Sequence, residues 1–208
     1  MSGRRPILWL TTSATLLLGA LLWVVFVWEP VTSGTAGHTV LELATPPEGG
    51  DFTLTQDGQH FALASLRGQV VLLYFGYTGC PDICPTSLAA IAQALRQLDA
   101  EPEGAVRGLF VSVDPERDTP ERLEAYAHFF HPAILGVSGT QEELVAVSAQ
   151  YGVAWRRVES GSAMGYLIDH SSNIYLIDAA GRLRTIFPHG VSGGELADAV
   201  TELLNEGG

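Results

Sequence analysis

Two cysteines four positions apart, Cys80 and Cys84, form a pair suited either to thiol redox chemistry or to metal binding. They lie in the segment Tyr74–Pro85, between an apolar run and a helical pattern, which places them at a helix N-terminus. Backbone N–H groups and the helix dipole favour a thiolate there. If Cys80 lies on the turn, either a disulfide or a shared metal ion is reachable. A purely structural disulfide would stabilise weakly, because so short a loop removes little unfolded-state entropy.

A metal site needs at least one ligand besides the two sulfurs. We expect His170 to supply it, because it follows the segment Tyr166–Asp169 on a loop entering a central strand. The other histidines have simpler explanations as tether, turn, helix-end or hairpin residues: His38, His60, His128, His131 and His189.

The elements that must position these residues alternate between strands and helices. The order strand, helix, strand, helix, then a hairpin and a final helix predicts an α/β fold, with a sheet covered by helices on both faces. Buried strands are expected at 69–75 and 106–113, helices at 87–98 and 119–129 and after the capping residues Thr140 and Ser192, and hairpin strands at 174–177 and 183–187.

The composition excludes several classes of protein. The chain has 208 residues, of which 47% are hydrophobic and 16% charged, so it is too apolar to be disordered. Its net charge is −12, and most of the 11 basic residues are scattered among 23 acidic ones, which excludes binding along a nucleic-acid backbone. Its 2 cysteines cannot form a disulfide-rich scaffold or a four-cysteine zinc site.

The N-terminal region predicts a membrane anchor. Residues 7–28 carry no charge, and a helix rising about 1.5 Å per residue over that length spans a hydrocarbon core of roughly 30 Å. Arg4 and Arg5 would keep the short N-terminus in the cytoplasm, so the rest would lie in the periplasm of a bacterial inner membrane. A cleaved signal peptide is the alternative, because small residues follow the apolar run. The predicted organisation is a cytoplasmic N-terminus at 1–6, a transmembrane helix at 7–28, a linker at 29–50 with one possible short strand at 39–43, and a domain at 51–208.

Three segments, in the same order along the chain, resemble the Sco/SenC family. They are Tyr74–Pro85, Val111–Pro120 and Tyr166–Ser172. The resemblance covers essentially the whole domain after the linker. It implies a thioredoxin-like fold and a membrane-anchored copper chaperone for cytochrome c oxidase. It further implies that Cys80, Cys84 and His170 bind copper, as Cu(I) or as Cu(II).

The chemistry of this ligand set agrees with the resemblance. Two thiolates and one imidazole form a soft set suited to Cu(I), although zinc could use the same ligands with a water molecule. By the resemblance, Asp169 is expected to orient the neighbouring histidine or its loop. Several family members carry His where Gly79 stands, so this chain lacks one further donor but no ligand.

Two further acidic residues lie in the second of the resembling segments. Asp114 precedes Pro115 and Asp118 precedes a helix cap, so both have a simple explanation as turn residues. The other interpretation is a docking surface, or an outer shell of the cysteine site.

Two functions fit the site. A metallochaperone would pass copper to the binuclear copper centre of an oxidase subunit, with another copper chaperone or a thiol reductase as further partners. Alternatively, a thiol-disulfide oxidoreductase would keep the oxidase's copper-binding cysteines reduced, with Cys80 attacking and Cys84 resolving. Peroxide reduction is disfavoured because no Thr stands three residues before Cys80.

Overall fold

The computed structural model describes residues 47–98, 102, 104–159 and 165–206, together with Trp23. The chain divides into two compact units, Met1–Glu42 and Leu43–Gly208, and all elements described below belong to the second. Apart from Trp23, the predicted membrane helix lies outside the described residues, as does the possible strand at 39–43. Among the described residues, no helix is both long and apolar enough to cross a membrane.

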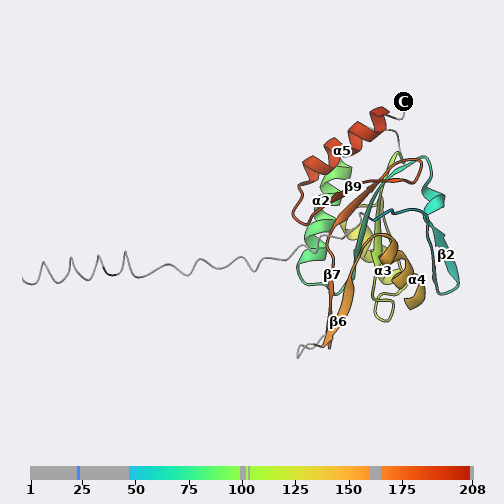
Figure 1. The fold of residues 1–208 in the computed structure, drawn as a ribbon, viewed down its shortest axis with the longest axis vertical. Coiled ribbons are helices and arrows are strands. Elements are labelled where there is room, and N and C mark those ends of the chain that lie inside the picture. Colours follow the sequence, from blue (N-terminus) through green and yellow to red (C-terminus); the bar gives the residue numbers. More distant parts are fainter. Residues whose placement is uncertain (1–22, 24–46, 99–101, 103, 160–164, 207–208) are drawn as a thin grey trace, which may run out of the picture. The chain divides into compact units, whose positions relative to one another are not determined.

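A five-stranded mixed sheet forms the centre of the second unit (Figure 1). Strand β3 (Val70–Gly76) lies in the middle, parallel to β4 (Val106–Ser112) and antiparallel to β8 (Ile174–Ile177). The two edge strands are β5 (Ile134–Val137) and β9 (Leu183–Phe187). All 7 residues of β3 are buried, as its continuous apolar run predicted, because a strand covered on both faces has no polar side.

Helices cover both faces of this sheet. Helix α2 (Ile83–Gln97) follows β3 and packs against α5 (Gly193–Glu206), which lies beside it in Figure 1. Helix α3 (Pro120–Phe130) connects β4 to β5, and α4 (Gln141–Gln150) follows β5. These helices confirm the predicted α/β arrangement.

Neighbouring residues of β3 show how the two faces are filled, since successive strand residues point to opposite sides. Tyr74 faces α2, where its hydroxyl lies beside the Cys84 thiol. Phe75 faces the other side and contacts Tyr151, just after α4, with ring centroids 5.8 Å apart. The cysteine segment therefore begins at the carboxyl end of a strand that is buried in the middle of the core.

The helix starts follow the capping signals in the sequence. Thr119 caps α3 and accepts a hydrogen bond from Arg122 N. Thr140 and Glu143 form the predicted capping box of α4. The Ser192 and Glu195 side chains bond each other's backbone N–H at the start of α5. Such caps satisfy N–H groups that have no partner within a helix.

The prediction was wrong about the surroundings of His170. This histidine is the last residue of a strand, β7 (Tyr166–His170), and does not lie on a loop. β7 pairs with β6 (Trp155–Glu159) in a two-stranded antiparallel ribbon, whose two orange strands run down to the lower end of the domain in Figure 1. The ribbon was missed because β6 reads Trp-Arg-Arg-Val-Glu, with no buried residue. The hairpin of β1 (Thr53–Gln56) and β2 (Gln59–Ala62), the short 3-10 helix Leu63–Leu66 and edge strand β5 were missed too.

Candidate metal centre

The two cysteines lie on either side of a helix start. Strand β3 ends at Gly76, a turn follows, and α2 begins at Ile83, four residues earlier than predicted. Cys84 is therefore in the first turn of α2, whereas Cys80 lies on the preceding turn, where its N–H donates to Tyr77 O at 3.3 Å. This is the placement in which both sulfurs can share one metal ion.

The structure brings the three predicted ligands together. Each of Cys80, Cys84 and His170 offers one ligand atom, and these three atoms lie within 4.8 Å of one another. The Cys84 sulfur is 3.2 Å from His170 Nε2, and the Cys80 sulfur accepts a hydrogen bond from Cys84 N at 3.4 Å. Both thiols are free. In the part of the chain that the structure describes, no other three His, Cys, Asp or Glu side chains form such a group.

A backbone contact sets the tautomer of His170. Its Nδ1 lies 2.9 Å from the Ser171 carbonyl oxygen, which can only accept. Nδ1 must therefore carry the proton, which leaves the lone pair of Nε2 directed at the two sulfurs. A partner of this kind orients the imidazole and makes it a better metal ligand.

The three ligands differ in exposure. Cys84 is completely buried, whereas Cys80 and His170 are half-buried. The aromatic rings of Tyr74 and Tyr77 stand edge-on to the imidazole, at 6.2 and 5.9 Å between centroids. The site thus has an aromatic wall on one side, and Cys80 and His170 are its partly exposed members.

Asp169 does not contact the imidazole. Its carboxylate is paired with Arg156 on β6 at 2.9 Å, and the two residues are partners in the ribbon's register. Both side chains are largely exposed, so the pair contributes little to stability. The expected orientation of His170 itself is supplied by the Ser171 carbonyl.

The pKa values of the two thiols are shifted in opposite directions. The pKa of Cys80 is lowered well below its ordinary value, chiefly by a hydrogen bond from the Cys84 thiol and also by backbone N–H groups, against partial burial, which raises it. Burial raises the pKa of Cys84, and the Cys80 sulfur beside it raises that pKa further. The pair therefore carries one thiolate, on the more exposed sulfur.

We expect iodoacetamide to modify Cys80 alone in the reduced, metal-free protein at pH 6. An ordinary thiol, with a pKa of about 8.5, is protonated and slow there. A lowered pKa keeps Cys80 a thiolate until the pH falls far into the acid range, whereas Cys84 is both buried and protonated. Mass mapping of the alkylated peptides measures the ratio, with urea-unfolded protein as the control. Equal modification of both cysteines in the folded protein would contradict the assignment.

Sequence reasoning missed the contacts that hold β7 against the body of the domain. The Ile168 N–H donates to the Tyr77 hydroxyl at 3.3 Å, and the Tyr166 hydroxyl donates to Asp114 at 2.7 Å. One signal was available: Tyr166, Ile168 and His170 alternate along the chain, which is the pattern of a strand with one face inward.

Comparison with known proteins supports the family that the three sequence motifs indicated. Residues 42–205 match the model of the SCO1/SenC family. The bovine mitochondrial protein SCO2 homolog is 41% identical over 153 residues, 73% of this chain and 58% of the bovine protein. The SCO2-like protein of Rickettsia prowazekii is 40% identical over 152 residues, covering 72% of this chain and 74% of the relative. This chain therefore matches less than two thirds of the bovine relative's length.

Solved structures agree. Copper-bound ScoI of Arabidopsis thaliana is 34% identical, with a TM-score of 0.70 over 76% of this chain and 98% of its own. Copper-bound ScoI of Bradyrhizobium japonicum is 38% identical, with a TM-score of 0.67 over 75% of this chain and 99% of its own. These likenesses confirm the thioredoxin-like α/β fold. Homologous structures thus hold copper, and this chain has a Cys-Cys-His group able to bind it.

Proposed function

Because the chain belongs to the SCO1/SenC family, we propose that it is a metallochaperone that delivers copper to the binuclear copper centre of cytochrome c oxidase. The observation that carries the proposal is the convergence of Cys80, Cys84 and His170 within 4.8 Å. Copper is the expected metal, because two sulfurs and one imidazole are a soft set and copper stands above zinc in the general affinity order. The copper bound by homologous structures supports the same choice.

The exposure of the ligands suits transfer. Cys84 is buried in α2 and would hold the ion from the protein side, whereas Cys80 and His170 are accessible. Thiolates of an acceptor could approach from the open side and replace these two ligands one at a time. A three-coordinate ion leaves room for that exchange. Copper is the cargo in this scheme and leaves with the acceptor.

The location and partners follow from the same proposal. Residues 7–28 would anchor the chain in a bacterial inner membrane, with the domain in the periplasm. The acceptor would be the oxidase subunit that holds the copper centre. A second copper chaperone would load the site, or a thiol reductase would keep its cysteines reduced.

Copper transfer is the test. The full-length reduced chain, in mild detergent and without oxygen, should bind one Cu(I) in competition with a chelator. Mixed with the reduced copper-centre domain of the oxidase subunit, it should then lose that copper to the acceptor. Separation of the two proteins and metal analysis of each gives the result. Failure to compete with the chelator, or retention of the copper beside an empty acceptor, would sink the proposal.

A thiol-disulfide oxidoreductase is the second candidate. Cys80 favours it, because this half-buried thiol has a lowered pKa. The Cys80 thiolate would attack a disulfide in the acceptor, releasing one acceptor thiolate and forming a mixed disulfide. Cys84, losing its proton, would then displace the second acceptor thiolate and leave a Cys80–Cys84 disulfide. Metal-free protein mixed with the oxidised acceptor tests this, since acceptor thiols should appear with the wild type and not with Cys80→Ser.

A further inference from the structure

The loop between β4 and α3 contains two buried carboxylates outside the proposed ligand set. Asp114 is 3% exposed and Asp118 is 1% exposed. Burial this deep excludes the docking surface considered for them from the sequence, because a partner could not reach either side chain. A buried carboxylate persists only where it is hydrogen bonded or paired. The partners of each therefore indicate its role.

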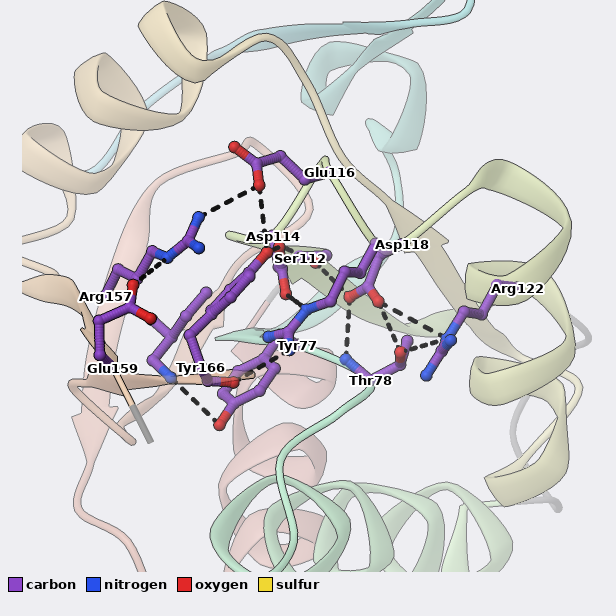
Figure 2. A network of polar contacts seen from close by, with 12 residues as sticks. Tyr77, Thr78, Ser112, Asp114, Glu116, Asp118, Arg122, Arg157, Glu159 and Tyr166 are labelled. Carbon is purple, nitrogen blue, oxygen red and sulfur yellow. Dashed lines mark hydrogen bonds and ion pairs between the residues drawn. The ribbon is translucent and has the colours of Figure 1, made fainter. Parts of the chain in front are cut away.

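Asp118 holds the turn that carries Cys80 (Figure 2). Its carboxylate accepts hydrogen bonds from the Thr78 N–H at 2.9 Å and from the Thr78 hydroxyl at 2.5 Å. Arg122 Nε donates to the same hydroxyl at 2.6 Å and lies 3.7 Å from the Asp118 carboxylate. Because Thr78 stands two residues before Cys80, these contacts fix the backbone from which the sulfur projects.

Asp114 holds the strand that carries His170 (Figure 2). Its carboxylate accepts from the Tyr166 hydroxyl at 2.7 Å and from Arg117 Nε at 2.5 Å. Arg117 also donates from Nη1 to the Tyr166 carbonyl at 3.0 Å, and its guanidinium lies 3.6 Å from the centre of the Tyr166 ring. Tyr166 is thus held through its hydroxyl, its carbonyl oxygen and its ring. It stands at the opposite end of β7 from His170.

Two side chains connect the contacts of Asp118 on the cysteine turn with the contacts of Asp114 on β7. The Ser112 hydroxyl donates to the Asp118 carboxylate at 2.6 Å and accepts from Asp114 N at 3.1 Å. Tyr77, on the cysteine turn, accepts from the Ile168 N–H of β7 at 3.3 Å. The cysteine turn and the histidine strand are therefore tied to one short loop and to each other.

We propose that residues 112–118 form a positioning loop, which sets the separation between the Cys80 sulfur and the His170 imidazole. Asp118 acts on the cysteine turn and Asp114 on the histidine strand. Both are positioning residues, because neither touches the proposed metal position. The inference rests on the proposed copper function and adds the residues that preorganise the site. Loss of an outer partner of this kind typically lowers metal affinity by roughly 10- to 100-fold.

Tyr166→Phe tests the histidine half, because it removes the hydroxyl that bonds Asp114 and keeps the ring. In the full-length chain we expect Cu(I) affinity to fall roughly tenfold. In a His170→Ala background the same change should cost less than roughly twofold, because the residue it positions is gone. In metal-free protein, amide hydrogen exchange across β7 should accelerate, which reports the loosened strand without any copper.

Thr78→Val tests the cysteine half by removing the hydroxyl at nearly constant volume. Cu(I) affinity should again fall roughly tenfold, and Thr78→Ser should restore it because the hydroxyl returns. In a Cys80→Ala background the Thr78→Val change should have little further effect. Exchange of the amides at residues 78–80 should rise in the metal-free Val variant.

Asp178→Asn is the matched control. Asp178 is 7% exposed and accepts from Arg182 Nε at 2.9 Å, so it is also a buried, paired carboxylate. It follows Ile177, which pairs with Val71 near the start of β3, at the end of the sheet away from Gly76. This variant should lose stability and keep the wild-type Cu(I) affinity.

The outcomes separate the inference from the function on which it rests. Unchanged affinity in Tyr166→Phe and Thr78→Val, beside a weakened His170→Ala, overturns the positioning loop and leaves the copper function standing. The positioning loop is also overturned if Tyr166→Phe lowers Cu(I) affinity by the same factor in the wild-type and in the His170→Ala background. If the wild type binds no Cu(I), the copper function fails, and unchanged hydrogen exchange in both variants would then overturn the positioning of the two elements as well.

Discussion

Cys84→Ser is expected to abolish Cu(I) binding in competition with a chelator. The substitution replaces a soft sulfur by a hard oxygen in the one ligand that is completely buried, so no solvent-side donor can take its place. The loss should exceed the roughly 10- to 100-fold that removal of an outer partner costs. His170→Ala should weaken binding less, because both sulfurs remain. Anaerobic titration of the full-length chains measures the order.

Ser87→Ala is the control for this experiment. Ser87 is also buried in α2, about one turn after Cys84, but its hydroxyl lies beside His189 Nδ1 at 3.3 Å. Its loss should leave the Cu(I) affinity at the wild-type value. A Cys84→Ser chain that still bound one copper as tightly as the wild type would remove Cys84 from the ligand set.

Gly76→Ala is expected to damage both the core and the site. A methyl group at Gly76 would lie 2.8 Å from the Cys84 sulfur and 3.1 Å from rings of both Tyr74 and Phe110. Overpacking of this kind typically costs about 1–3 kcal/mol of stability. Since the thiol must move to relieve it, Cu(I) affinity should fall as well. Thermal unfolding of the metal-free protein and chelator competition measure the two effects separately.

Gly108→Ala separates these effects. A methyl group there would meet Ile134 Cγ1 at the same 2.8 Å, but in β4 and away from the sulfurs. We therefore expect a similar loss of stability, on the order of 1–3 kcal/mol, with unchanged Cu(I) affinity. If both variants lowered copper affinity equally, the effect would come from general loosening of the core, and the specific role of Gly76 would be wrong.

One of the three candidate ligands is deeply buried and the other two are partly exposed, which is the arrangement that the proposed transfer of copper needs. Cys84 and the Tyr74 ring form its buried side. Cys80 and His170 reach it from separate elements, a turn and a strand end. The proposed positioning loop connects those two elements, so the affinity of the site would depend on contacts that the candidate ligands do not make themselves.

Much of the architecture could be predicted from local patterns. The apolar run before Gly76, the capping box at Thr140 and the hairpin around Gly181 each specify an element through nearby residues. The ribbon that carries His170 could not be found in this way. Its strand β6 is polar and partly exposed. It pairs with β7, where Tyr166 bonds Asp114, so contacts with other segments place the ribbon and its own residue pattern does not.

The family, the fold class and the three candidate ligands could be predicted from the sequence, because motifs, their spacing and hydrophobic periodicity are properties of the chain alone. The folded arrangement is needed to see that Cys80 lies outside the helix and that His170 ends a strand beside it. The same holds for the burial of Asp114 and Asp118. These facts depend on contacts between segments far apart in the chain, such as Thr78 with Asp118, which no local pattern encodes.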